Sequence, residues 1–322
     1  MTRSTVLMLA GFVLLTLPAC SSSSDAVRAT APLTASASQA PSAVRSDGGP
    51  PASVVFYSRR GGGASKIYAM NPDGSGVQQL TTGPGNDLWP DISRNGQRIA
   101  FASNRSGNNE IYVLDLRSGS LANVSQSSAD DNWPRWSPNG QELVFHSNRA
   151  GNYDLYVVSV DDGSLRQVTN APALDQWPDW SPNGKQIAFR RETDVYVADV
   201  DGLEQNVRQL TFSPTVIDQM PAWSPDGKQL AYMSFAAGYC SVFLMDTEGN
   251  GAVNLTPKNP ADASSAWCSR APSWSRNGQR IYFMSARPST SGDVELFSMA
   301  ADGSALERLT SASGEDGGPR MR

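Results

Sequence analysis

From Val54 onward, short apolar runs alternate with polar, glycine-containing turns, and the whole pattern repeats itself. The repeats align on one proline, and successive copies of it are 44, 44, 43, 51 and 47 residues apart. The aligned residues are Pro90, Pro134, Pro178, Pro221, Pro272 and Pro319. Four short strands in a period of about 44 residues are typical of a β-propeller blade. No segment has the period of an amphipathic helix, which argues against alternating strands and helices.

Every repeat predicts the same order of strands and turns. After the proline comes a turn with Asn or Asp before Gly, residues that tolerate the positive φ of a tight hairpin. The next strand is expected at Arg98–Ser103, Glu142–Ser147, Gln186–Arg190, Gln229–Ser234 and Arg280–Ser285. A further strand is expected at Ile111–Leu114, Leu155–Val158, Val195–Ala198, Val242–Met245 and Leu296–Met299. A short last strand ends each repeat, as at Leu210-Thr211.

The two ends of the repeat region predict the number of blades. Val54–Ser58, Lys66–Met70 and Gln78–Thr81 supply three strands of a blade that lacks its first strand. The segment from Asp316 to the C-terminus repeats the first-strand pattern of the other blades. We therefore expect an all-β, six-bladed β-propeller over residues 53–322 that is closed by the C-terminal strand, because closure removes exposed sheet edges.

The N-terminal residues predict that the protein is located outside the cytoplasm. Residues 1–19 combine Arg3 with an apolar run too short to span a membrane, as in a secretory signal peptide. Leu17-Pro18-Ala19-Cys20 resembles the lipobox of bacterial lipoproteins, which implies a lipid-modified (palmitoylated) Cys20; an ordinary signal with an incidental cysteine is the alternative. Residues 20–52 are rich in Ser, Ala and Pro, so we expect a flexible tether. The expected location is the cell envelope, on the periplasmic side of the outer membrane or at the cell surface.

Composition and charge argue against nucleic-acid binding and against several kinds of enzyme. Lys and Arg number 26 against 31 Asp and Glu, a net charge of −5 with no basic cluster, which argues against nucleic acid as a partner. The single histidine, His146, lies inside a predicted strand, and we assign it no catalytic role. No phosphate-binding loop or nucleophile motif is present. The sequence therefore gives little support to an enzyme.

The repeat Pro-x-Trp-Ser-Pro-Asp/Asn-Gly, followed by Ile-Ala-Phe-x-Ser-x-Arg and Asp-Gly…Leu-Thr, resembles the propeller repeats of TolB-type proteins. Similar repeats occur in bacterial lipoproteins, tricorn-type proteases and oligogalacturonate lyases. The resemblance covers residues 54–322 and implies the fold, whereas the roles of such propellers differ. TolB-type proteins carry an α/β domain ahead of the propeller. This chain has only the predicted tether there, so a Tol-like envelope role does not transfer directly.

An acidic residue stands three positions before the aligned proline in five repeats, and Ser269 interrupts the series. The five are Asp87, Asp131, Asp175, Asp218 and Asp316. If the proline strand is innermost, these carboxylates form a ring near one mouth of the channel that could hold Ca²⁺ or attract a cationic peptide. The alternative is pairing within the fold. Its candidate partners are Arg60, Arg105, Arg149 and Arg287, with Glu110, Asp154, Asp194 and Glu295 nearby.

Directly before the proline, three successive repeats carry Trp89, Trp133 and Trp177, where the others carry Met220, Ala271 and Gly318. Three aromatic residues beside the aspartate ring could stack on a sugar or a basic side chain. The alternative is packing between blades. Packing is the role we expect for the tryptophans two positions after the proline, which are Trp136, Trp180, Trp223 and Trp274.

Cys240 and Cys268 remain once Cys20 is assigned to the anchor, and an oxidising compartment favours a disulfide between them. The bond is expected on the face of the aspartate ring and is worth roughly 3–4 kcal/mol. It would hold the insertion Pro257–Arg270, which includes Trp267. A metal site from two cysteines without a nearby histidine is disfavoured.

Together these features predict a monomeric, lipid-anchored propeller that binds or scaffolds an envelope protein or peptide, with a glycan as the second candidate. No catalytic residue, nucleic acid or cofactor is expected, apart from Ca²⁺ at the acidic mouth. The rival hypothesis is a calcium-dependent hydrolase or glycan-binding propeller that uses the same acidic mouth.

Overall fold

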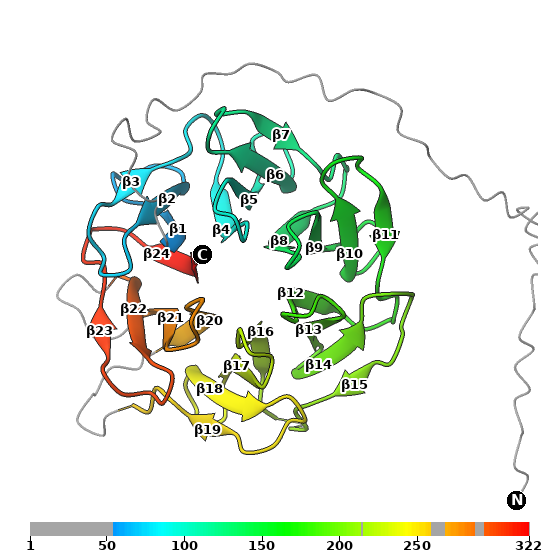
Figure 1. Cartoon of the computed structure of the whole chain (residues 1–322), viewed down its shortest axis with the longest axis vertical. Helices are drawn as coiled ribbons and strands as arrows, with labels where there is room; N and C mark the ends of the chain where they lie inside the picture. Colours follow the sequence, from blue (N-terminus) through cyan, green and yellow to red (C-terminus); the bar gives the residue numbers. More distant parts are fainter. Residues whose placement is uncertain (1–53, 214, 259–267, 287–292, 322) are drawn as a thin grey trace, which may run out of the picture. The chain divides into compact units, whose positions relative to one another are not determined.

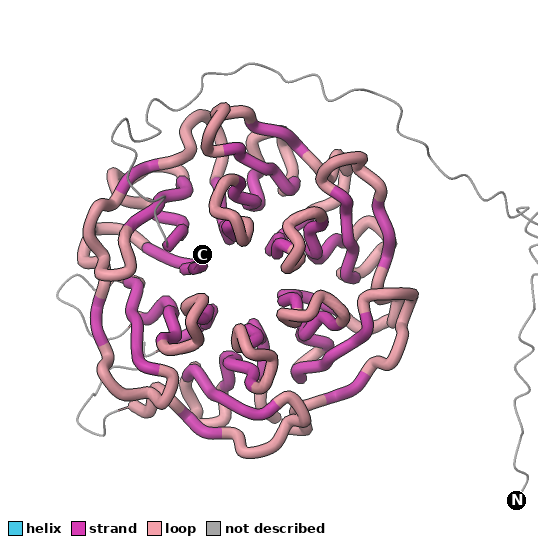
Figure 2. The backbone as a smooth tube through the Cα atoms, viewed as in Figure 1, coloured by secondary structure: helices cyan, strands magenta, loops and turns pink. Residues whose placement is uncertain are grey.

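The computed structural model describes residues 54–213, 215–258, 268–286 and 293–321. The predicted signal peptide, Cys20, the tether, Trp267 and Arg287 lie outside these ranges. All regular elements in them are strands, 24 in number, which form six four-stranded antiparallel sheets around a common axis (Figure 1). The described residues contain no helix (Figure 2), and so none that is long and apolar enough to cross a membrane.

Each sheet is one blade, and its first strand lies innermost (Figure 1). The innermost strands are β4 (Asp87–Ile92), β8 (Asp131–Trp136), β12 (Asp175–Trp180), β16 (Asp218–Trp223), β20 (Ser269–Trp274) and β24 (Asp316–Met321). The second strands are β5 (Arg98–Ser103), β9 (Glu142–Ser147), β13 (Gln186–Arg191), β17 (Gln229–Ser234), β21 (Arg280–Ser285) and β1 (Val54–Ser58). The third are β6 (Glu110–Asp115), β10 (Asp154–Ser159), β14 (Asp194–Asp199), β18 (Ser241–Asp246), β22 (Glu295–Ala300) and β2 (Lys66–Met70). The outermost are β7 (Leu121–Asn123), β11 (Leu165–Gln167), β15 (Arg208–Gln209), β19 (Val253–Asn254), β23 (Glu307–Arg308) and β3 (Gln78–Gln79).

The last blade joins the two ends of the repeat region. β24 pairs antiparallel with β1, with Val54 opposite Met321 and Ser58 opposite Asp316. The predicted closure and the six-bladed fold class are therefore confirmed. In each blade the first strand runs toward the turn and the second strand runs back from it, so the turns lie at one end of the propeller and the starts of the innermost strands lie at the other. We call the end with the Ser-x-Asn/Asp-Gly turns the turn face, and the end at which the innermost strands begin the loop face.

The turns that join first and second strands are held by their own side chains. In the turn Ser93–Gly96, the hydroxyl of Ser93 accepts a hydrogen bond from the backbone N–H of Arg98 at 2.9 Å. Asn95 Oδ1 in turn accepts hydrogen bonds from the Ser93 hydroxyl and from the N–H of Gln97. Gly96 has φ of 71°, which explains why glycine closes this turn. The same serine and Asn/Asp pattern forms the other four turns.

A β-bulge interrupts every innermost strand at the residue before the aligned proline. That residue has a left-handed φ in all six blades: Trp89 52°, Trp133 58°, Trp177 55°, Met220 54°, Ala271 53° and Gly318 57°. Five of the six are not glycine, and this conformation costs about 1–2 kcal/mol for each of them. The bulge takes the residue out of the strand alternation. The alternation of a regular strand therefore does not predict how the side chain at this position packs.

The core lies between the blades as much as within them. Trp136 packs against Ala100 and Val113 of the preceding blade, and its indole N–H donates to the carbonyl of Asp91 there. Trp180 and Trp274 donate in the same way to the carbonyls of Arg135 and Ala222. The predicted inter-blade packing of Trp136, Trp180, Trp223 and Trp274 is therefore confirmed.

Candidate functional site

The aspartates of the predicted ring are buried and bonded at the loop face. Asp87 accepts a hydrogen bond of 2.7 Å from Arg105 and lies 3.6 Å from Lys66. The pairs Asp131–Arg149 and Asp316–Arg60 have the same geometry, each at 2.8 Å, and all three carboxylates are fully buried. These contacts are the pairing within the fold that the sequence left open.

Three blades vary this arrangement. In the blade of β12, Asp175 is bound by Arg191, which also reaches Glu204, because the loop after β13 is shorter than in other blades. Among the described residues Asp218 has no arginine partner, and it is held by Ser234 and Thr211. At the interruption of the ring, Ser269 bonds to Ser285 at 2.9 Å. The contribution of Arg191 was missed because it stands where the Ser-x-Arg segments of other blades carry the serine.

The acidic residues that begin the third strands are also used within blades. Glu110 accepts from the hydroxyl of Ser125, and Glu295 accepts from that of Thr310, both at 2.6 Å. Calcium at the aspartate ring would have to displace the arginines that are bonded to Asp87, Asp131, Asp175 and Asp316. In the described part of the chain, no group of three or more His, Cys, Asp or Glu side chains is arranged to hold a metal ion. Calcium binding stays a prediction.

The tryptophans before the proline form one aromatic cluster around the axis. The ring centroids of Trp89 and Trp133 are 4.2 Å apart, and those of Trp133 and Trp177 are 6.3 Å apart. Tyr57 continues the series against Trp89 at 5.0 Å. Trp133 is 1% exposed and carries the guanidinium of Arg135 over its ring. The structure thus brings the three together by packing, with Trp89 and Trp177 half-buried, and recognition by them stays a prediction.

The single histidine is part of the same packing. His146 is buried, and its Nδ1 accepts a hydrogen bond of 3.3 Å from the backbone N–H of Trp177 in the next blade. Burial and the nearby Arg135 lower the pKa of His146 to about 3. The imidazole is therefore neutral at physiological pH and serves as an acceptor between blades.

The predicted disulfide is present. Cys240 and Cys268 are bonded, with their Cα atoms 4.5 Å apart, and the Ser269 N–H donates to the Cys240 carbonyl at 2.9 Å. The bond links the blade of β18 to the start of β20 at the loop face. Most of the insertion that it closes lies outside the described residues.

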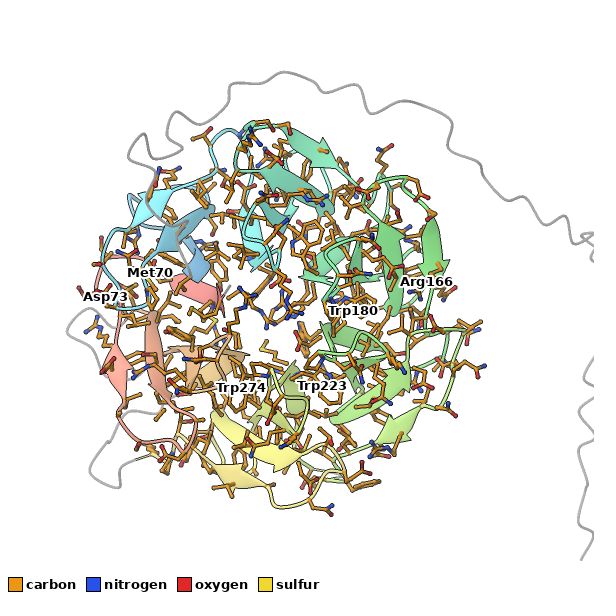
Figure 3. All side chains as sticks on the ribbon, viewed as in Figure 1. Met70, Asp73, Arg166, Trp180, Trp223 and Trp274 are labelled. Atoms are coloured by element: carbon orange, nitrogen blue, oxygen red, sulfur yellow. A yellow bond between two sulfur atoms is a disulfide. The ribbon has the colours of Figure 1, made fainter. Side chains whose placement is uncertain are left out.

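The opposite mouth of the channel, at the turn face, has a different character. A pocket of about 340 Å³ opens there between the innermost strands and the turns that follow them. Trp180, Trp223 and Trp274 come from neighbouring blades on one side of the ring (Figure 3), and all three line this pocket. Sequence reasoning did not select this site, because the tryptophans were assigned to packing alone.

Charged side chains enter the pocket from the position directly after the aligned proline. That position carries Arg320, Asp91, Arg135 and Asp179 in four consecutive blades, and Ala222 and Ser273 in the other two. Asp179 Oδ1 lies 3.5 Å from Arg320 and 3.7 Å from Arg135. The alternation of charge at this one position is visible in the sequence and is the signal that could have located the pocket.

Burial shifts the pKa values of Asp91, Asp179 and Arg135. It raises the pKa of Asp91 and of Asp179, and the guanidinium groups of Arg135 and Arg320 counteract that rise. Burial also lowers the pKa of Arg135, and the positive charge of Arg320 adds to that effect. Two like charges are thus held close together in a poorly solvated site. Such perturbed groups in a cavity are typical of functional sites.

Fold and site together define a class of protein: a closed six-bladed β-propeller with an ion-paired loop face and a charged pocket at the turn face. The family model of the TolB beta propeller domain matches residues 88–194 and 190–322, and the chain belongs to this family. No curated protein matches the chain significantly.

Solved structures show the same fold at low sequence identity. TolB from Acinetobacter baumannii is 22% identical, with 84% of this chain and 67% of that chain covered and a TM-score of 0.69. A putative TolB from Agrobacterium tumefaciens is also 22% identical, covering 82% and 90%, with a TM-score of 0.64. An oligogalacturonate lyase from Vibrio parahaemolyticus is 16% identical, covering 77% and 72%, with a TM-score of 0.54. The fold alone therefore does not distinguish binding from catalysis.

The ion pairs of the ring predict a loss of stability rather than a loss of binding when one is removed. We expect Asp131→Asn to lower the free energy of unfolding by about 3 kcal/mol, because Arg149 then loses the partner of a buried pair. Asp161→Asn removes an exposed carboxylate 3.7 Å from Arg98 and should cost less than about 0.5 kcal/mol. Urea unfolding of both variants measures the difference. Equal stability of the two would show that the ring carboxylates are not structural.

Asp154 predicts a dependence of stability on pH. Burial, together with the charges of Asp175 and Glu204, raises its pKa to about 7, against 3.8 in the unfolded chain. The folded chain therefore binds more protons between these values, so this group makes stability fall as pH rises from about 4 to about 7. We expect Asp154→Asn to raise the melting temperature at pH 8 but not at pH 4. A variant that melts like the wild type at both pH values would contradict the assignment.

Proposed function

We propose that the protein is a lipid-anchored binding module of the cell envelope, and that its partner protein docks on the turn face. The observation that carries the proposal is the difference between the two channel mouths. At the loop face, the repeated carboxylates are bonded to arginine, serine and threonine within the blades. At the turn face, side chains that differ from blade to blade line an open pocket.

Variation between blades supports a role in recognition. Residues required by the fold recur: the bulge keeps its conformation in all six blades, and the turn serine keeps its identity in all five turns between first and second strands. The position after the proline does not recur in this way, since it holds Asp, Arg, Ala and Ser in different blades. A surface that is asymmetric on a symmetric scaffold can match one partner in one orientation.

Membership of the TolB propeller family supports an extracytoplasmic role, and the predicted lipobox at Cys20 supports the anchor. Val54, the first described residue, lies at the turn face opposite Met321. The chain thus enters the propeller on the same face as the pocket. As a coil, the predicted tether of about 30 residues would reach on the order of 30 Å, which would leave space for a partner between propeller and membrane.

Site-specific crosslinking in cells tests which face binds. A photoreactive residue at position 182, beside the pocket, is expected to capture one defined protein, whereas the same group at position 170 on the loop face is not. The double variant Arg94→Glu/Arg276→Glu should abolish the capture, because both arginines line the pocket. Arg117→Glu, on the same face but outside the pocket, should leave it unchanged. Capture from position 170 alone would instead place recognition at the aspartate and tryptophan face.

The anchor has its own test. In bacterial cells that produce the full chain, Cys20→Ala should move the protein from the membrane fraction to the soluble extracytoplasmic fraction and abolish incorporation of labelled palmitate. Ser21→Ala serves as the control and should change neither. A Cys20→Ala chain that stays in the membrane fraction would contradict lipid anchoring.

A further inference from the structure

We propose that the turn-face pocket is a binding site for an oxyanion, a carboxylate or phosphate group, which is held by Arg135 and Arg320 with Arg94 and Arg276 at the rim. The inference rests on the proposed function, since it names the chemistry recognised at the same mouth. Four arginines and two aspartates line the pocket, so its charge is positive.

The two aspartates of the pocket are already used by the fold. Asp91 Oδ2 accepts a hydrogen bond of 2.7 Å from the backbone N–H of Trp136 in the next blade. Asp179 Oδ2 accepts one of 2.8 Å from the N–H of Trp223, again one blade further on. Each carboxylate therefore joins two blades. These acids are fixed in place, and they do not saturate the arginines beside them.

The two buried arginines retain unused donors. Each guanidinium has five N–H groups. In the described residues, Arg135 makes one hydrogen bond, of 2.7 Å to the carbonyl of Pro134, and its buried Nε has no hydrogen-bond partner. Arg320 makes one bond, of 3.5 Å to Asp179. A buried charge with unpaired donors is costly, and an oxyanion bound between the two guanidinium groups would satisfy several donors at once.

The rim of the pocket adds positive charge on one side. The second residue of the turn is proline in three blades, at Pro138, Pro182 and Pro225. It is arginine in the two blades that flank β24, at Arg94 and Arg276. Both arginines are exposed, and neither makes a hydrogen bond or ion pair within the described ranges. Arg276, Arg320 and Arg94 thus lie on three consecutive blades.

The walls of the pocket strengthen the attraction. Indole side chains from four blades surround the guanidinium groups and reduce the local dielectric constant, and charges of one sign in such a cleft concentrate anions. A volume of about 340 Å³ accommodates a carboxylate or phosphate group together with part of the molecule that carries it. The geometry favours a discrete ligand group over a diffuse charged surface.

Calorimetric titration of the full chain at constant ionic strength tests the site, with inorganic phosphate and acetate as probes. We expect saturable binding that weakens about tenfold or more in Arg320→Gln, which removes charged hydrogen bonds. The rim variant Arg94→Gln/Arg276→Gln changes only exposed residues, so it should fold normally and lose about two- to fivefold. Arg117→Gln, which removes an exposed arginine of the same face outside the pocket, should bind like the wild type.

The probes also distinguish the source of the oxyanion. Binding of both ions in competition supports a general oxyanion site, and binding of phosphate alone supports a phosphate-bearing ligand. Competition by vesicles of phosphatidylglycerol in phosphatidylcholine supports a lipid headgroup as its source. Vesicle binding without small-ion binding, or equal binding by all variants, would overturn the inference. If crosslinked capture from position 182 persists without oxyanion binding, only this inference fails, whereas oxyanion binding without such capture contradicts the proposed function.

Discussion

The pairing of β24 with β1 holds the ring together. Five of the six sheets are continuous in sequence, whereas the sixth takes its innermost strand from the other end of the repeat region. The closed ring gives every blade a neighbour on both sides, and tryptophans cross from one blade to the next. The closing strand is also the least bulky of the six: a Cβ atom at Gly317 would collide with the buried phenol of Tyr57, so this blade admits glycine where others carry larger residues.

The charged side chains at the two ends of the channel make different contacts. At the loop face, strands of one blade converge on a buried aspartate, and arginines that stack on neighbouring aromatic rings neutralise it. At the turn face, the aspartates of the pocket instead bond to the backbone of the next blade and leave two arginines with free donors. The same kinds of side chain therefore stabilise one end and remain available at the other.

Family membership fixes the scaffold and leaves the chemistry open. The chain belongs to the TolB beta propeller family, and the repeats, the bulge and the turns recur among its own blades. The blades of this chain differ from one another at the position after the proline, at the second residue of the turn and at the small residues of the closing blade. These differences carry the proposed function, because symmetric features cannot orient a partner.

The sequence by itself determined the fold class, the number of blades, the closing strand and the inter-blade tryptophans, because each follows from periodicity or from local turn chemistry. It predicted the disulfide between Cys240 and Cys268 because these two cysteines remain once Cys20 is assigned to the anchor. It also identified the aspartates and arginines of the loop face, but it left open whether they face one another or a ligand. Only the tertiary structure decided that, since pairing depends on the distance between side chains of different strands. The charges of the turn-face pocket alternate visibly in the sequence, but the pocket itself was found only in the tertiary structure, because it forms where six segments that are distant in the chain meet at one axis.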